Sequence, residues 1–166
     1  MGTSLADLRN EITSAIHGMS TEELGRHAEG KWSTAEILDH LNLSYVGTIK
    51  GLRRCLQSGQ VFTKGSRLKN FGKRVGLIRL GYFPPGRKSP ERVRPRGNPA
   101  EQVRVEVLEN LVELEKVITD CETKFGKGKP VADHPVLGPL TASEWRKFHV
   151  VHGKHHVKQI LRLRQS

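Results

Sequence analysis

Apolar side chains recur at spacings of three and four residues along four long stretches of the chain, the pattern of an α-helix with one buried face. No convincing alternation of apolar and polar positions, which would predict a β-strand, competes with this pattern. We therefore predict four long helices: from about Leu5 to His17, from Ser33 to about Gln57, from Asn98 to Gly126, and from Thr141 nearly to the C-terminus.

Residues that favour helix ends support these boundaries. Pro99 suits the first helical position of the third helix, where its missing N–H has no cost. Three serine or threonine residues are each followed three positions later by glutamate, as in a capping box: Ser20 and Glu23, Ser33 and Glu36, Thr141 and Glu144. The fold class we predict is all-α, an antiparallel four-helix bundle with a long crossover between the second and third helices.

The length and composition restrict the class of protein further. A chain of 166 residues predicts a single domain. Cys55 and Cys121 are too few for a disulfide framework or a thiolate zinc site. The first dozen residues include acids and no apolar run, so they do not predict a signal peptide. No stretch reaches the roughly 18 consecutive apolar residues typical of a membrane-spanning helix. We expect a soluble cytoplasmic protein with no membrane partner.

The positive charge is concentrated in one part of the chain. The formal net charge is +11, and residues 60–98, here called the basic segment, hold eleven lysines and arginines against one acid, Glu91, and so carry +10. Many glycines and prolines in the basic segment predict loop and broken helix. Part of it, residues 68–83, fits a basic amphipathic helix with these apolar residues on one side: Leu68, Phe71, Val75 and Ile78.

Two interpretations of the basic segment are open. It is either a solvated surface connection that keeps the protein soluble, or a region that attracts an anion such as a substrate carboxylate or phosphate, nucleic acid or an acidic lipid surface. No recognised nucleic-acid-binding motif accompanies the charge, so nucleic acid is not an expected partner.

The last predicted helix contains four of the eight histidines: His149, His152, His155 and His156. At about 100° per residue, His156 lies about 40° from His152, and both fall within the apolar stripe that faces the interior. Two buried neutral imidazoles one turn apart can bind one metal ion. The alternative is a pair of core histidines that hydrogen-bond to backbone or water.

A third metal ligand would have to come from another helix, and His40 in the second helix is the candidate. Its stripe continues through the small residues Ser44, Gly47 and Gly51, which leave either a cavity for a ligand or room for a close helix contact. The larger apolar residues cover a separate face of this helix: Leu38, Leu41, Tyr45, Ile49 and Leu52.

Two motifs together resemble the DinB-like (YfiT-like) metalloenzyme superfamily. One is Trp32-Ser-Thr-Ala-Glu-Ile-Leu-Asp-His40, and the other is His152-Gly-Lys-His155-His156-Val-Lys-Gln159. Residues 134–145 look like one little-characterised branch of that superfamily. The resemblance implies a four-helix bundle, often dimeric, that binds a divalent metal ion through three histidines. Carried over position by position, these are His40, His152 and His156.

Three imidazoles suit zinc, nickel or iron(II), and three protein ligands leave an open position, as in catalytic sites. Characterised relatives are bacillithiol or mycothiol S-transferases and a thiol-dependent maleylpyruvate isomerase. The resemblance therefore implies a metal-dependent enzyme that activates a low-molecular-weight thiol for conjugation to a small-molecule electrophile. The alternatives are metal-hydroxide hydrolysis of an amide or ester, and a non-catalytic, stress-related protein that binds metal or nucleic acid.

One face of the last helix argues for a homodimer. Val150, Val157 and Leu161 lie opposite the histidine stripe, at the spacing of a short coiled-coil seam. Either a helix of a second copy covers this face, or the basic segment or the N-terminal segment folds over it within one chain.

Overall fold

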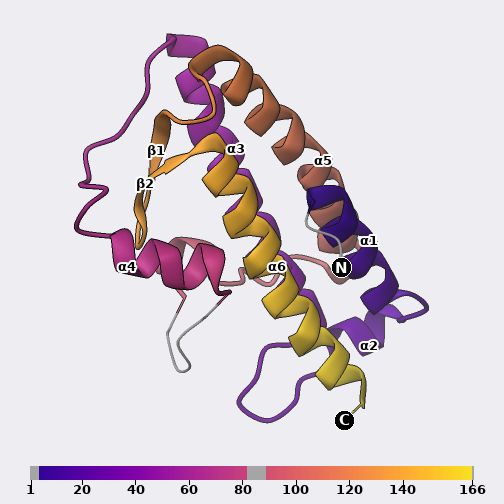
Figure 1. Ribbon diagram of the computed structural model, residues 1–166. Helices are drawn as coiled ribbons and strands as arrows, with labels where there is room; N and C mark the ends of the chain where they lie inside the picture. Colours follow the sequence, from indigo (N-terminus) through magenta and orange to yellow (C-terminus); the bar gives the residue numbers. More distant parts are fainter. Residues whose placement is uncertain (1–3, 82–88, 166) are drawn as a thin grey trace.

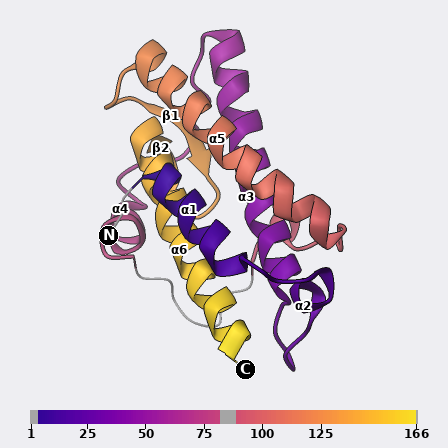
Figure 2. The ribbon, with the colours of Figure 1, turned by 90° about the vertical axis from the view of Figure 1, so that its right-hand side faces the viewer.

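The protein is mostly helical in the computed structural model, which describes residues 4–81 and 89–165. Four long helices dominate the described part (Figures 1 and 2): α1 (Leu5–Ile16), α3 (Thr34–Ser58), α5 (Ala100–Phe125) and α6 (Ala142–Gln165). The shorter elements are α2 (Thr21–Gly25), α4 (Phe71–Arg74) with a π-helical turn (Val75–Arg79) directly after it, and a 3-10 turn (Glu91–Val93).

The three predicted capping boxes are present and begin α2, α3 and α6. The Ser33 hydroxyl accepts a hydrogen bond from the backbone N–H of Glu36 at 3.2 Å, and the Glu36 carboxylate accepts one from the N–H of Ser33 at 2.8 Å. This satisfies two of the backbone groups left open at a helix start and fixes where α3 begins. The same reciprocal pair occurs at Ser4 and Asp7, Ser20 and Glu23, and Thr141 and Glu144.

Helices α3 and α5 lie side by side and run in the same direction. Asn110 donates to the Asn42 side-chain oxygen in the first half of both helices, and Lys124 donates to the Leu56 carbonyl near both C-terminal ends. A parallel pair requires the connecting chain to return along the length of α3. The long segment between the two helices provides that return.

Helices α1 and α6 form the second pair. Glu11 is ion-paired with Lys154 at 3.4 Å, and Arg164 donates to the Ala15 carbonyl at 2.8 Å, so these two helices also run in the same direction. Contacts of His40 and Thr48 with α6 run in the opposite order, so the α1–α6 pair is antiparallel to the α3–α5 pair.

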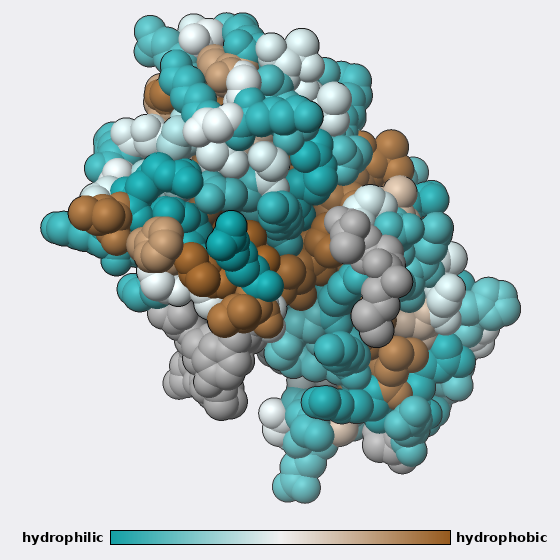
Figure 3. All heavy atoms as spheres, in the orientation of Figure 1, coloured by the Kyte–Doolittle hydropathy of each residue, from teal (hydrophilic) through white to brown (hydrophobic). Residues whose placement is uncertain are grey.

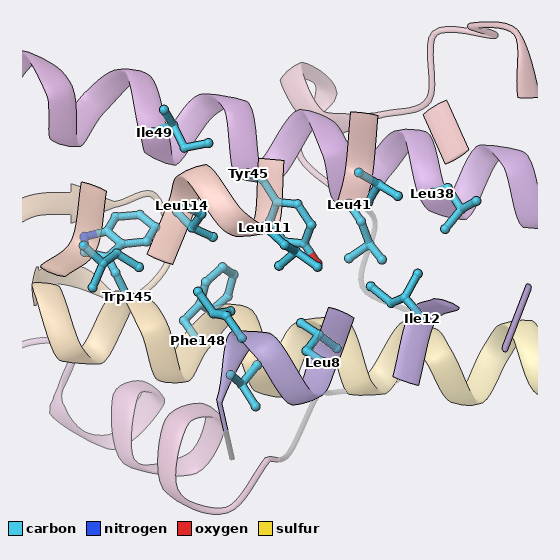
Figure 4. Packing of buried hydrophobic residues seen from close by; sticks show 14 of the residues in the cluster. Leu8, Ile12, Leu38, Leu41, Tyr45, Ile49, Leu111, Leu114, Trp145 and Phe148 are labelled. Atoms are coloured by element: carbon cyan, nitrogen blue, oxygen red, sulfur yellow. The ribbon is translucent and has the colours of Figure 1, made fainter. Parts of the chain in front are cut away.

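One hydrophobic core lies between the two pairs. The predicted apolar face of α3, with Leu38, Leu41 and Tyr45, points at Leu8 and Ile12 of α1 and at residues of α5 and α6 (Figure 4). All five residues are fully buried. Such packing removes apolar surface from water and accounts for most of the stability of a helical domain.

The fold is mostly helical, as the predicted all-α class requires, and it also contains one short antiparallel pair of strands that the sequence did not predict. Strands β1 (Pro130–His134) and β2 (Gly138–Thr141) pair with each other between α5 and α6. All four residues of β2 are buried, so the sequence shows no alternation there. The prolines at 130 and 139 also disfavour a strand assignment. The hairpin matters because His134 lies at the end of β1.

Part of the basic segment is held in place by carboxylates. Asp133 accepts hydrogen bonds from the backbone N–H of Lys64 and Gly65 at 2.7 and 3.0 Å. Glu144, which caps α6, accepts two hydrogen bonds from the Arg67 guanidinium, at 2.9 and 3.1 Å. Arg74 lies 3.5 Å from the same carboxylate and is buried. These two arginines therefore hold the basic segment against the fold, a role that neither interpretation of the segment included.

The predicted amphipathic helix over residues 68–83 is wrong in extent and in orientation. Helical turns cover residues 71–79, and residues 82–88 lie outside the described ranges. Leu68 and Phe71 are 85% and 59% exposed, whereas Arg74 and Leu77 are buried. The contact of Arg74 with Glu144 turns that side of the segment inward, so the apolar side predicted from spacing is not the buried one.

The face of α6 that suggested a homodimer is covered within the chain. Val150 and Val157 are buried, and α1 packs along this side of α6. Leu161 is 44% exposed. The N-terminal segment is therefore the cover, which was the alternative to a second copy. A homodimer remains a prediction from the family resemblance and would need a different surface.

The surface carries hydrophobic as well as hydrophilic regions. On the face seen in Figure 3, hydrophobic atoms gather in the middle, with hydrophilic atoms above and below them. Leu68 and Leu80 of the basic segment are the most exposed large apolar residues of the described ranges. No helix in these ranges combines the length and the apolar character needed to cross a lipid bilayer.

Candidate metal centre

Three predicted histidines meet where α3 crosses α6. His40 comes from α3, and His152 and His156 come from consecutive turns of α6. The Nε2 atom of His152 lies 3.0 Å from Nε2 of His40 and 3.1 Å from Nε2 of His156. Metal–nitrogen distances of about 2.0–2.1 Å place neighbouring ligand nitrogens about 2.9–3.4 Å apart at octahedral to tetrahedral angles. Both distances fit one metal ion.

The second ring nitrogen of two of these histidines is engaged by an acceptor. His40 Nδ1 lies 2.7 Å from the Val93 carbonyl oxygen, and His156 Nδ1 lies 2.8 Å from the Gln159 side-chain oxygen. A carbonyl oxygen accepts and cannot donate, so Nδ1 carries the proton in both rings. Nε2 of each neutral ring is then unprotonated, and its lone pair points at His152.

With these tautomers, the three Nε2 atoms cannot all be satisfied by hydrogen bonds to one another, whereas a cation between them would satisfy all three. A proton on Nε2 of His152 can be donated to His40 or to His156, but not to both at full strength. At least one nitrogen lone pair therefore faces another nitrogen at about 3 Å unless a positive ion lies between them. The donor set, all imidazole nitrogen with no carboxylate or thiolate in the cluster, suits a borderline divalent metal ion.

Burial keeps the three imidazoles neutral and able to act as ligands. All three are buried, and removal from water is the main cause that lowers the pKa of each ring. The pKa of His156 falls to about 3, and the repulsion that a protonated His40 would exert on a protonated His156 is a further cause. A histidine must be deprotonated at one nitrogen to bind a metal. The cluster meets this condition at neutral pH.

A buried aspartate positions the carbonyl that orients His40. Asp39, the preceding residue on α3, accepts hydrogen bonds from the Arg96 backbone N–H at 2.7 Å and the Asn98 side chain at 3.0 Å. These bonds fix the end of the basic segment against α3. Val93, three residues before Arg96, is thereby held where its carbonyl reaches His40. Neither Asp39 nor Val93 carried a signal in the sequence.

The histidine cluster forms part of the wall of a large cavity. The cavity has a volume of about 1260 Å³ and is lined by α3, α6, β1 and the basic segment. Ser44, Gly47 and Gly51 line it, and a Cβ at either glycine would meet no atom within 4 Å. The small residues beside His40 therefore border open space rather than a close helix contact, which decides between the two predicted alternatives.

The other histidines of α6 have different surroundings. His149 is fully buried, and its Nε2 donates to the Thr48 hydroxyl at 2.9 Å, because that hydroxyl donates in turn to the Ser44 carbonyl. This fits a core histidine. His155 is half-buried at the cavity wall, and its Nε2 accepts a hydrogen bond from the Gln159 amide at 3.2 Å. Gln159 thus contacts both His155 and His156.

His134 is a residue of the cavity whose importance the sequence did not indicate. Its Nδ1 accepts hydrogen bonds from the backbone N–H of Val136 and of Leu137, at 3.1 and 3.2 Å. Its ring packs against Phe148 with the centroids 4.4 Å apart, and Phe148 stacks on His152 at 5.3 Å. Burial, together with the charge of Arg92, lowers its pKa to about 4.

The fold and the site together define a class, namely helical proteins with a buried group of three histidines at a cavity between two helix pairs. Comparison with known families gives a further assignment. The chain belongs to the family described as "Protein of unknown function (DUF1569)", whose sequence profile matches residues 4–162 and so includes all three histidines. No curated protein and no solved structure matches the chain significantly.

Proposed function

We propose that this protein is a DinB-like metalloenzyme, a four-helix bundle in which the α1–α6 pair runs antiparallel to the α3–α5 pair and which binds one divalent metal ion through His40, His152 and His156. The observation that carries the proposal is the convergence of three Nε2 atoms while the Nδ1 atoms of His40 and His156 are held by acceptors. Core histidines without a ligand would face a protein or water partner with both nitrogens, as His149 does in part, rather than face one another.

The reaction we propose is the conjugation of a low-molecular-weight thiol to a small-molecule electrophile. A divalent ion with an open position lowers the pKa of a thiol beside it and supplies a thiolate, whose sulfur bonds to an electrophilic carbon as the leaving group departs with its electrons. The protein residues would orient the ligands, through Val93 and Gln159, and admit both molecules. Gly47 and Gly51 keep the cavity wide next to His40.

Elemental analysis tests the metal proposal. Protein purified without added metal and without nickel affinity resin should contain about one zinc, nickel or iron ion per chain. His40→Ala and His152→Ala should each abolish tight binding, and His155→Ala should matter less. His17→Ala is the matched control, because His17 is exposed at the end of α1, away from the cavity. Unchanged metal content in both ligand variants would contradict the proposal.

Kinetics with model substrates tests the reaction. The metal-loaded protein should accelerate the reaction of a thiol with 1-chloro-2,4-dinitrobenzene, and the rate should fall to background after metal removal and in His152→Ala. The competing function, hydrolysis of an amide or ester, predicts instead a metal-dependent release of nitrophenol from a nitrophenyl ester in the absence of thiol. That result without any thiol-dependent rate would replace conjugation by hydrolysis.

A further inference from the structure

The walls of the cavity carry an excess of positive charge near the histidine cluster. Three arginines of the basic segment line the cavity: Arg92, Arg94 and Arg96. Among the described lining residues, Asp133 is the one carboxylate, and its Oδ2 already accepts two backbone N–H groups. Because the histidines of the wall are neutral, the charge of the guanidinium groups is not balanced within the cavity.

Arg92 differs from the bases that hold the fold together. Arg67 and Arg74 are paired with Glu144, whereas Arg92 makes no hydrogen bond or ion pair with any residue of the ranges 4–81 and 89–165. It lies close enough to His134 for its charge to lower the pKa of that ring. A guanidinium group presents five N–H donors in a planar fork that matches a carboxylate or phosphate.

His134 supplies a second donor at the same place. Its Nδ1 accepts two backbone N–H groups, so Nδ1 is unprotonated and the proton of the neutral ring is on Nε2. No residue in the described ranges hydrogen-bonds to His134 Nε2, and the half-buried ring lines the cavity. The hairpin turn thus fixes Nε2 as the donor nitrogen of a ring that lines the cavity. This tautomer cannot act as a base at Nε2.

We propose that Arg92 and His134 form an anion-binding subsite and that the substrate of the cavity carries an anionic oxygen group, a carboxylate or a phosphate. The role of this subsite in catalysis rests on the proposed function. Phe148 links the two places, because its ring contacts both His134 and the proposed metal ligand His152. We therefore expect a molecule held at one end by the subsite to lie beside Phe148, with its other end toward the histidine cluster.

Calorimetric titration with benzoate, and with its uncharged analogue benzamide, tests the subsite. We choose an aromatic acid because Phe148 and Trp145 also line the cavity. Benzoate should bind to both the metal-loaded and the metal-free protein, and benzamide should bind at least about tenfold more weakly. Inorganic phosphate is the competitor: stronger displacement of benzoate by phosphate than by acetate would assign the anionic group as a phosphate.

Three variants assign the binding to these residues. Arg92→Gln should weaken benzoate at least about tenfold. His134→Asn keeps an acceptor for the turn but removes the Nε2–H donor, and should weaken benzoate with unchanged helical content. Arg79→Gln is the control, because Arg79 is an exposed base of the same segment that does not line the cavity. If His134→Asn fails to fold, the comparison of Arg92→Gln with Arg79→Gln still decides.

The outcomes separate this inference from the proposed function. Benzoate that binds only to metal-loaded protein, with equal affinity in Arg92→Gln, would be a metal ligand and would overturn the subsite while supporting the metal centre. Loss of metal binding would leave the subsite standing if the metal-free protein binds benzoate in an Arg92-dependent way. Equal affinity for benzoate and benzamide would overturn the subsite in either case.

Discussion

Two histidines of the candidate metal centre, His40 and His156, are oriented by the contact that their second ring nitrogen makes. His40 is oriented by the backbone carbonyl of Val93, which belongs to a distant part of the chain, and His156 by the side chain of Gln159, one turn further along α6. Such contacts fix the ring orientation and raise the basicity of the ligand nitrogen. They can be removed one at a time without touching a ligand.

At the scale of single residues, Gln159→Ala should weaken the metal site. The variant removes the acceptor for Nδ1 of His156, so the ring can rotate or change its tautomer. Loss of a contact of this kind lowers metal affinity about 10–100-fold. Competition with a chromophoric chelator measures the affinity. Gln102→Ala, on the exposed side of α5, is the control, and equal affinities in the two variants would show that Gln159 has no orienting role.

The contrast between His156 and His134 explains which site residues could be predicted. His152 and His156 share one helix, so their spacing alone placed them on one face, and the small residues after His40 indicated space beside it. The role of His134 depends on the turn between β1 and β2, and that of Asp39 depends on a segment 57 residues away. Neither the turn at His134 nor the contact of Asp39 produces a periodic pattern in the sequence from which it could be predicted.

At the scale of elements, two helical glycines have opposite functions. Gly47 of α3 borders the cavity, and an added Cβ would meet nothing within 4 Å. Gly153 of α6 faces α1, and an added Cβ would lie only 2.7 Å from Cδ1 of Leu8 and closer still to Cδ2. Leu8 is fully buried, so its side chain can move away only by displacing neighbours in the close-packed core. One glycine keeps a cavity open, and the other allows two helices to approach.

Alanine at these two positions should therefore change stability in opposite directions. Gly47→Ala should raise the free energy of unfolding by about 0.5–1 kcal/mol, because alanine is the better helix former and nothing is displaced. Gly153→Ala gains the same propensity but forces Leu8 aside, with a net loss of about 1–3 kcal/mol. Urea unfolding followed by circular dichroism measures both. Stabilisation by Gly153→Ala would contradict the close approach of α1 and α6.

The positions at which the long helices begin could be predicted from the sequence, whereas the structure of the segments between the helices could not. Ser33 and Thr141 mark the start of α3 and α6 because a capping box is a local motif. The strand β2 is too short and too uniformly buried to show a period. Leu68 and Phe71 suggested a buried helical face, but the ion pair of Arg74 with Glu144 determined the orientation. The long-range ion pair, and not the local apolar pattern, therefore determined which side of this segment is buried.

At the scale of the whole molecule, the basic segment connects the fold to the candidate site. Because α3 and α5 run in the same direction, the segment has to cross the molecule between them. Its first part is fixed by Asp133 and Glu144, and its last part by Asp39. Between these anchors it supplies the carbonyl for His40 and the arginines of the cavity wall. Part of its charge is thus paired with a carboxylate of the fold, whereas attraction of an anion by the arginines of the cavity wall stays a proposal.

The stability of the whole chain should depend on pH through its buried neutral histidines. The folded protein lowers the pKa of His134 to about 4 and that of His149 to about 3, mainly through burial, whereas both titrate near 6.5 in the unfolded chain. Between these values the unfolded state binds protons that the folded state does not. The free energy of unfolding is therefore highest above pH 6.5 and falls as the pH is lowered.

For the metal-free protein, this linkage predicts a loss of about 1 kcal/mol per histidine between pH 7 and pH 5.5. Glu122 and Glu144 contribute little in this range, because the folded chain lowers the pKa of both carboxyl groups through their hydrogen bonds to arginine. Urea unfolding in the presence of a chelator measures the loss. His134→Asn should reduce the loss by about 1 kcal/mol, since one titrating group is gone, and His17→Gln, at an exposed position, should leave it unchanged. A stability that is flat over this range, or equal losses in His134→Asn and the unmodified protein, would mean that His134 is protonated as easily in the folded chain as in the unfolded one.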